Sequence, residues 1–200
     1  MTVPSSPEIA PADRERVLRE LIAADAWRMR VLQAVRDLDL PDWAIGAGFV
    51  RSRVWDWLCG DRRSTMPTDI DVLYYDRHDL DPAHETVLER RLNAVLPAPW
   101  SVTNQARMHI DNAEAPYAST EDALRHWLET PTAVAVRLSA DGRIETLAPW
   151  GLQDLFTMTV RPTPSGRAKM DIYRRRLANK GWTRHWPVRV VDGQAQRTGS

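Results

Sequence analysis

The stretch of this chain that most constrains its fold runs from residue 43 to 76, WAIGAGFVRSRVWDWLCGDRRSTMPTDIDVLYYD. It contains a glycine turn, then a helix, and then a strand in which two carboxylates are separated by one residue. Side chains along a strand point to alternate faces, so Asp69 and Asp71 lie on one side of that strand. Ile70 and Val72 then point into a core. Two adjacent carboxylates repel each other unless a cation lies between them, and the natural partner is a hard divalent ion, Mg²⁺ or Mn²⁺.

The glycine turn follows a short apolar segment, residues 42–45, that predicts a buried strand. After Gly46-Ala47-Gly48, apolar residues recur at helical spacing: Phe49, Val50, Val54, Trp55 and Leu58. Small residues at a strand-to-helix turn let the backbone approach a ligand closely, and the N–H groups at a helix start suit a phosphate. Arg51 and Arg53 lie in the first turns of this helix, where their charge would favour the same ligand.

Length and composition predict one compact domain over residues 13–187, between a flexible tail at 1–12 and a C-terminal tail at 188–200. A hydrophobic share of 43% with 27% charged residues is typical of a globular protein. The single cysteine, Cys59, excludes an internal disulfide and a cysteine-based zinc site, and we expect it to be buried at a helix end. No secretory signal and no run of about 18 apolar residues occurs, so we expect a cytoplasmic protein.

The charge is balanced overall but not along the chain. Residues 161–200 hold ten Lys and Arg against two Asp, which leaves 27 − 10 = 17 basic against 27 − 2 = 25 acidic residues for the first 160. The basic residues concentrate in 161–180, where Met170, Tyr173 and Leu177 recur at helical spacing. We therefore expect a helix with one buried face and a basic outer face.

Two functions for this basic helix stay open. Lys169, Arg174 and Lys180 could reach a triphosphate bound opposite the aspartates. Alternatively, the run 174–176 could contact RNA, with Trp182 and Trp186 stacking its bases.

The remaining elements follow from periodicity and turn chemistry. We expect one broken or two successive helices over 12–38, a helix over 82–95 that buries Val87, Leu88, Leu92 and Val95, and a strand from Trp100. Ser119 begins a further helix. A hairpin joins 132–138 to 143–147 through Asp141-Gly142, and a short helix covers 151–158. This order predicts an α/β (α+β) domain: a mixed sheet with the carboxylate strand at its centre, flanked by helices, with N-terminal helices and a C-terminal basic helix.

Together, these motifs resemble the polymerase β-like nucleotidyltransferase superfamily, which combines a glycine-rich turn with paired carboxylates. The wider match is to a bacterial group known only as nucleotidyltransferase family proteins and covers most of residues 14–187. Its further matching segments are Val54-Trp55-Asp56, Asn104 to His109, Ala133 to Leu138, Ala148 to Leu152 and Trp186-Pro187.

The resemblance implies that Gly46, Ala47 and Gly48, with Arg51, bind the triphosphate of an NTP. It also implies that Asp69 and Asp71 are the catalytic residues and bind Mg²⁺ or Mn²⁺. In this superfamily an acceptor hydroxyl attacks the α-phosphate and pyrophosphate leaves. The acceptor is not indicated by the sequence.

A third carboxylate is expected on a neighbouring strand, but residues 100–103 contain none. The candidates for this role are Asp111, Asp154 and Glu145. Additional candidate contacts are Arg53, Asn104, Arg107 and His109, because guanidinium, amide and imidazole groups hydrogen-bond to substrates and the last two also coordinate metals. The alternative function is a catalytically degenerate member of the same fold that binds nucleotide, RNA or a protein through the basic helix.

Overall fold

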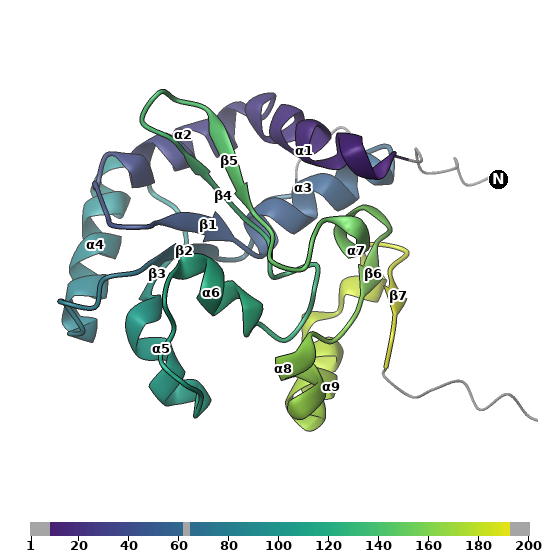
Figure 1. Cartoon of the computed structure of the whole chain (residues 1–200). Helices are drawn as coiled ribbons and strands as arrows, with labels where there is room; N and C mark the ends of the chain where they lie inside the picture. Colours follow the sequence, from purple (N-terminus) through teal and green to yellow (C-terminus); the bar gives the residue numbers. More distant parts are fainter. Residues whose placement is uncertain (1–8, 62–64, 193–200) are drawn as a thin grey trace, which may run out of the picture.

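A five-stranded mixed sheet forms the centre of the fold (Figure 1). The computed structural model describes residues 9–61 and 65–192. The strands are β1 (Ala44–Gly46), β2 (Ile70–Tyr74), β3 (Trp100–Asn104), β4 (Ala135–Leu138) and β5 (Ile144–Leu147), in the order β3-β2-β1-β4-β5. Strands β2 and β3 are parallel, and the other neighbours are antiparallel. The predicted mixed sheet and hairpin are confirmed, but β1 holds the centre and the carboxylate strand β2 lies beside it.

Four helices pack against the sheet face that carries Ile70, Val72 and Val136. They are α1 (Arg14–Ala23), α2 (Ala26–Arg36), α3 (Gly48–Leu58) and α4 (Pro82–Val95). The predicted N-terminal helical region is two helices, because the Asp25 side chain accepts hydrogen bonds from the backbone N–H groups of Trp27 and Arg28 and begins α2. This layer contains most of the apolar core.

Helix α4 has the predicted bounds but not the predicted buried face. Leu88 and Leu92 are buried, whereas Val87 and Val95 are exposed. Glu85 takes a buried position instead, because its carboxylate accepts hydrogen bonds from the backbone of Asn104 at 2.7 Å and from Arg107 at 2.9 and 2.5 Å.

The opposite face of the sheet is covered by α5 (Gln105–Asn112) and α6 (Thr120–Arg125). Leu73 points to this face and packs with Ala44, Leu124, Ala135 and Leu147, against which Trp127 is partly buried. Ser119 caps α6 as predicted. Helix α5 was not expected, since β3 passes into it directly at Asn104, whose side chain caps the helix.

The C-terminal part adds α7 (Gln153–Phe156), β6 (Thr159–Val160), α8 (Pro164–Ala168), α9 (Met170–Lys180) and β7 (Arg189–Val190), with short 3-10 helices at Pro11–Asp13 and Trp182–Arg184. Strands β6 and β7 form a small parallel sheet that the sequence did not predict. Tyr173 is the buried residue of α9, and its hydroxyl lies 3.2 Å from the Val160 carbonyl oxygen and 3.0 Å from that of Val191.

The tails at 1–12 and 188–200 fall mainly outside the described residues, although β7 lies within the second.

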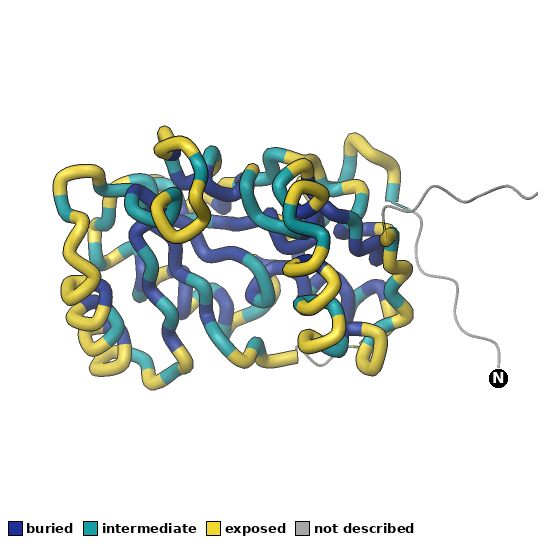
Figure 2. The backbone as a smooth tube through the Cα atoms, turned by 90° about the horizontal axis from the view of Figure 1, so that it is seen from below, coloured by how far each residue is buried: buried dark blue, intermediate teal, exposed yellow. Residues whose placement is uncertain are grey.

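Burial follows the layers: the strands and the inner helix faces are buried, and the outer turns are exposed (Figure 2). Four tryptophans, at positions 43, 55, 100 and 182, are buried. Cys59, expected to be buried, is exposed, because the buried face of α3 ends at Leu58 and the chain turns outward there. Within the part of the chain that the structure describes, no helix is long and apolar enough to span a bilayer.

Candidate functional site

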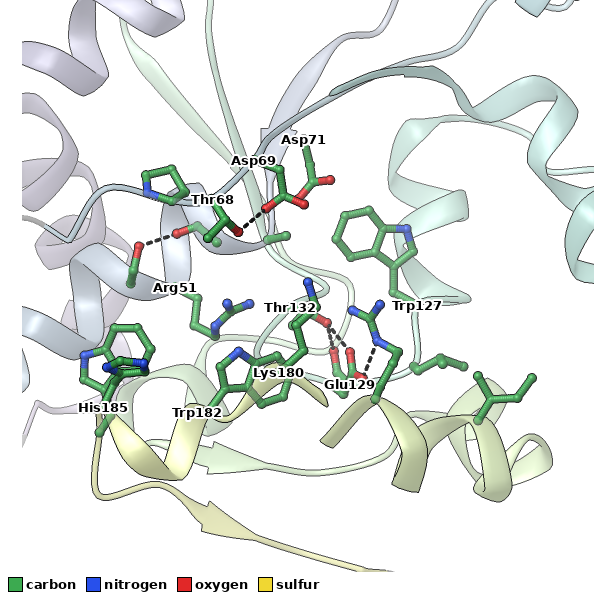
Figure 3. A pocket seen from close by; sticks show the side chains of 18 of the residues that line it. Arg51, Thr68, Asp69, Asp71, Trp127, Glu129, Thr132, Lys180, Trp182 and His185 are labelled. Carbon is green, nitrogen blue, oxygen red and sulfur yellow. Dashed lines mark hydrogen bonds and ion pairs between the residues drawn. The ribbon is translucent and has the colours of Figure 1, made fainter. Parts of the chain in front are cut away.

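The paired carboxylates lie at the start of β2 and open into a cleft of about 700 Å³. Figure 3 shows the carboxylates of Asp69 and Asp71 side by side at one wall of this cleft. Asp69 lies just before β2 and accepts a hydrogen bond from the Thr68 hydroxyl at 3.1 Å. Ile70 and Val72 are fully buried on the other face, so the predicted alternation of the strand is correct.

Asp71 is half-buried and accepts no hydrogen bond from the described residues. Burial raises the pKa of its carboxyl group to about 6, and the adjacent charge of Asp69 adds to this rise. Lys180, Arg51 and Arg176 oppose it through their positive charge. The positive groups of the protein therefore compensate the negative charge of Asp71 only in part.

The glycine turn lies beside this pair, because the antiparallel pairing of Ile45 with Val72 brings Gly46 next to Asp71. The residue with unusual backbone is Ala47, at φ 50° and ψ −121°. The first N–H groups of a helix have no intrahelical partner. Ala47 occupies the cap position of α3 and offers them no side-chain hydrogen bond. Ala47 and Gly48 both line the cleft, where these groups can bind an anion.

Arg51 is buried in the cleft wall and forms no hydrogen bond with the described residues. Its guanidinium group lies 5.3 Å from the Trp55 ring centre and 4.6 Å from that of Trp182, and its Nε is buried without a partner. Burial lowers the pKa of Arg51 to about 10, which leaves it charged at neutral pH. A buried charged group without hydrogen bonds is costly, so this site favours an incoming anion.

The wall opposite the aspartates comes from the C-terminal part of the chain, through Lys169, Ile172, Arg176 and Lys180 of the α8–α9 region and through Trp182, His185 and Trp186. The Trp182 ring packs against the Arg51 guanidinium group, and Figure 3 shows Lys180 near both. The Arg176 Nε donates to the buried carboxylate of Glu129 at 2.8 Å, and the Thr132 hydroxyl donates to the same carboxylate at 2.9 Å. The predicted basic helix thus turns Arg176 and Lys180 toward the carboxylates, whereas Arg174 pairs with Asp192 elsewhere.

The additional candidate residues lie in different places. Arg53 is 3.8 Å from Asp25 and does not line the cleft. Asn104 is buried as the cap of α5 and donates to the carbonyl oxygens of Asp76 and Asp79. Arg107 binds Glu85.

His109 lies with its Nδ1 3.0 Å from the carbonyl oxygen of Ala106, and it is not among the cleft residues. Its ring packs edge-on against Tyr117.

Of the candidates for a third carboxylate, only Asp111 lines the cleft. Its side chain is 60% exposed and lies 3.5 Å from Arg107. Asp154 accepts hydrogen bonds from Thr130 and Arg161 away from the cleft, and Glu145 pairs with Arg137. Ser101 is the β3 neighbour of Asp71, in the position where a strand carboxylate would lie.

A divalent cation fits the two aspartates by the chemistry of the donors. Both offer hard carboxylate oxygens to one cleft, and the charge of Asp71 lacks a hydrogen-bond partner among the described residues. In residues 9–61 and 65–192, no group of three or more His, Cys, Asp or Glu is arranged to hold a metal. Asp69 and Asp71 could therefore provide two ligands, with the others coming from phosphate oxygens and water, as Mg²⁺ commonly accepts.

Sequence reasoning did not identify Trp127, Glu129 or Thr132 as cleft residues. Trp127 falls at the end of an apolar helical run, which is typical of a core residue. Glu129 and Thr132 lie in the loop between α6 and β4, where neither periodicity nor a motif marks them.

Comparisons with known proteins show the family and the fold of this chain. A nucleotidyltransferase family model matches residues 33–190. A structure described as revealing a CCA-adding enzyme head domain, solved by NMR, is 32% identical with a TM-score of 0.78, over 88% of this chain and 95% of that chain. No curated protein matches this chain.

Two larger structures share the fold at lower identity. A CCA-adding enzyme in complex with CTP is 16% identical with a TM-score of 0.55, over 89% of this chain. A tRNA-processing enzyme in an apo form is 16% identical with a TM-score of 0.51, over 93% of this chain. This chain covers only 43% and 45% of their respective lengths. Since the family model spans most of the chain and the head-domain relative matches it nearly end to end, the chain belongs to the nucleotidyltransferase family, the transferases of nucleotidyl groups.

Proposed function

We propose that this protein transfers a nucleotidyl group from an NTP to an acceptor, with Asp69 and Asp71 holding Mg²⁺ or Mn²⁺. One observation carries the proposal. The paired carboxylates open into the same cleft as an unpaired, buried guanidinium group, that of Arg51. A triphosphate needs cations on several sides, and this cleft presents them from α3 and α9 while leaving two carboxylates for a divalent ion.

The residues of the chain have separate tasks in this reaction. The N–H groups at the start of α3 bind a phosphate, and Arg51 and Lys180 attract the β- and γ-phosphates. The acceptor oxygen attacks the α-phosphorus while the bond to the bridging oxygen of the β-phosphate breaks, and pyrophosphate leaves. Divalent ions, when bound, neutralise the negative charge on the attacking and leaving oxygens. The protein contributes positioning and preorganised charge.

The first experiment is thermal unfolding of wild type and of the double variant Asp69→Asn/Asp71→Asn against each NTP, with Mg²⁺ or Mn²⁺. A ligand at one hundred times its Kd adds about 2.7 kcal/mol to the stability of the protein. We expect a shift for wild type that needs both metal and NTP, and none for the double variant. Glu121→Gln removes an exposed carboxylate outside the cleft and should retain the shift. No shift with any NTP would contradict the proposal.

Release of pyrophosphate together with labelling of an acceptor distinguishes transfer from hydrolysis. The CCA-adding and tRNA-processing enzymes that share the fold make RNA ends the first acceptors to screen. Free phosphate or nucleoside monophosphate without a labelled acceptor would favour hydrolysis instead.

A second candidate function is the binding of RNA on the outer side of α9. A separate hollow of about 310 Å³ lies there, lined by Arg161, Arg167 and Arg174. Two of these arginines form ion pairs, with Asp154 and Asp192. The variant Arg167→Ala/Arg174→Ala should weaken a salt-dependent RNA interaction, while Asp69→Asn leaves it intact. Absence of salt-sensitive binding would remove this candidate.

A further inference from the structure

The cleft has two chemically different ends on either side of the carboxylate pair. Figure 3 shows Arg51, Trp182 and His185 on one side of Asp69 and Asp71, and the indole ring of Trp127 on the other. The first end is cationic. The second is formed by an aromatic ring with polar groups around it, among them His126, Asn112 and Lys169, whose charge is paired with Glu114.

Trp127 is held in place beside the carboxylates. A Cβ atom at Gly46 would lie 3.4 Å from its ring atom Cη2, and Gly46 is the neighbour of Asp71 in the sheet. The backbone carbonyl of Trp127 accepts a hydrogen bond from the Thr163 hydroxyl at 2.5 Å. The ring is half-buried against the cluster that contains Leu73, and it also lines the cleft.

The polar groups around this end are fixed by a small network centred on Glu114. Its carboxylate binds Lys169 Nζ at 2.8 Å and His126 Nδ1 at 2.7 Å, and it accepts a hydrogen bond from Tyr117 at 2.6 Å. Asn112 donates to the Tyr117 hydroxyl at 3.0 Å. A ligand at this end therefore meets an aromatic ring whose surroundings are already ordered.

The other tryptophans of the cleft are already engaged. Trp182 is buried, and its ring lies under the Arg51 guanidinium group. Trp186 packs edge-on against Trp55 and donates its Nε1–H to Asp56 at 2.8 Å. Among the tryptophans that line the cleft in the described chain, Trp127 is thus the one without a cation or a second indole against its ring.

We propose that Trp127 is the stacking platform for the nucleobase of the NTP, and so a substrate-binding residue of this site. The inference rests on the proposed function, because it assumes that the ligand of the cleft is an NTP. An NTP carries its negative charge at one end and a planar ring at the other, which matches the two ends of the cleft. Every nucleobase has a π-face, so the platform accepts any base, and hydrogen bonds at its edge select among them.

The test compares an NTP with inorganic tripolyphosphate, which has the charge but no base. Each is titrated by calorimetry with Mg²⁺ into wild type, Trp127→Leu and Trp127→Phe. The leucine variant should bind the NTP about 5- to 150-fold more weakly, the loss that corresponds to removing one base–aromatic stack. Tripolyphosphate affinity should not change, and the phenylalanine variant should retain most of the NTP affinity. Trp150→Leu, a matched change in an exposed tryptophan outside the cleft, should bind both as wild type does.

Several outcomes would overturn the inference. An unchanged NTP affinity in Trp127→Leu would show that the base lies elsewhere, and an equal loss for both ligands would show that Trp127 supports the phosphate end. If wild type binds tripolyphosphate and NTP equally, the cleft has no base platform, although the phosphate site of the proposed function stands. If wild type binds neither, the proposed function itself fails.

A second measurement covers the case in which Trp127→Leu does not fold. Wild type is irradiated with 8-azidoadenosine triphosphate and, separately, with 5-iodouridine triphosphate, and the labelled peptide is mapped. We expect the label at Trp127 or at its cleft neighbours His126 and Leu128. Labelling at Trp182, His185 or Trp186 would place the base at the cationic end and overturn the inference.

Discussion

At the residue scale, two residues of this site have unusual properties, Asp71 and Ala47. The Asp71 carboxyl group is half-buried with a raised pKa, and Ala47 holds a backbone conformation that favours glycine. Both features cost stability in the free protein. Backbone strain and buried charge are typical of sites where binding of a ligand compensates the cost.

The raised pKa of Asp71 predicts that the free energy of unfolding of the protein depends on pH. Its folded pKa of about 6 exceeds the unfolded value of 3.8, so the folded state holds the extra proton between these values. The charge of Asp71 therefore destabilises the metal-free fold at pH above about 6, and this penalty disappears as pH falls to about 4. Asp71→Asn should be more stable than wild type at pH 8, by at most about 3 kcal/mol, and the difference should vanish near pH 4. Urea unfolding in the presence of a chelator measures this.

The control for that experiment is Asp111→Asn, which removes an exposed carboxylate at the same cleft. It should show no comparable gain at pH 8. A stability difference between Asp71→Asn and wild type that stays constant from pH 4 to 8 would contradict the burial of the charge.

The positive φ of Ala47 predicts that glycine at this position stabilises the protein. A non-glycine residue at positive φ costs about 1–3 kcal/mol, and glycine removes this strain but loses more backbone entropy on folding. Ala47→Gly should therefore stabilise the protein by about 1 kcal/mol and raise Tm by about 2–4 °C, measured by calorimetry. NTP binding should persist, because the turn offers only its backbone. Ala44→Gly, in β1, should lower Tm; a lower Tm for Ala47→Gly as well would contradict the strain.

The sequence predicted the carboxylate pair of this site but not the conformation of the turn. Alternation along β2 is a local property of any strand, so it placed Asp69 and Asp71 on one face correctly. The left-handed residue in Gly46-Ala47-Gly48 is the alanine, because the geometry is set by how β1 enters α3 and not by which residue tolerates it best. Trp127 was missed because its partners, Gly46 and Leu73, are distant in sequence.

At the scale of elements, α9 forms a wall of the cleft because one tyrosine anchors it. The Tyr173 hydroxyl is buried between two carbonyl oxygens, of Val160 before α8 and Val191 after β7. This contact joins α9 to the small β6–β7 sheet. Arg176 is held in addition by its ion pair with Glu129.

Tyr173→Phe removes this hydrogen bond. We expect a loss of about 1 kcal/mol in stability and faster amide exchange in α9 by hydrogen–deuterium exchange. Tyr75→Phe is the matched control, since the Tyr75 hydroxyl donates to the Tyr117 carbonyl oxygen far from α9 in sequence. It should cost similar stability without altering exchange in α9. Unchanged exchange in Tyr173→Phe would show that other contacts anchor the helix.

The prediction of helices and strands succeeded where neighbouring residues in the sequence determine the element. It failed where contacts with distant residues determine it. Helix α4 begins at Asp81-Pro82, a cap and a first-turn proline, and its bounds were correct. Its predicted buried face was correct for Leu88 and Leu92 and wrong for Val87 and Val95. Glu85 is drawn inward instead by Asn104 of β3 and Arg107 of α5. Strands β6 and β7 contain two residues each, too few for any alternation to mark them.

At the scale of the whole molecule, the C-terminal part is joined to the sheet domain through α3. The Trp55 ring packs edge-on against Trp182 and Trp186, with ring centres 6.2 and 5.4 Å apart. The buried Asp56 carboxylate accepts hydrogen bonds from Trp186 and from the backbone and hydroxyl of Thr65. These contacts give the two parts a shared apolar core.

We therefore expect one unfolding transition. Tryptophan fluorescence and far-UV circular dichroism should give the same midpoint in urea. Asp56→Ala leaves three donors without their acceptor and should lower both midpoints together, by about 2–4 kcal/mol. An earlier fluorescence transition, with the helical signal retained, would show that the C-terminal part melts on its own.

The C-terminal wall of the cleft also has a consequence for how the protein is made. Arg176, Lys180 and Trp182 follow Asp71 in the chain by more than 100 residues, so the ribosome releases Asp71 well before it releases them. A nascent chain at that stage presents its two carboxylates without the cations opposite them. Nucleotide binding therefore cannot assist the early folding of the sheet, which must form from its own apolar contacts before the substrate has a complete site.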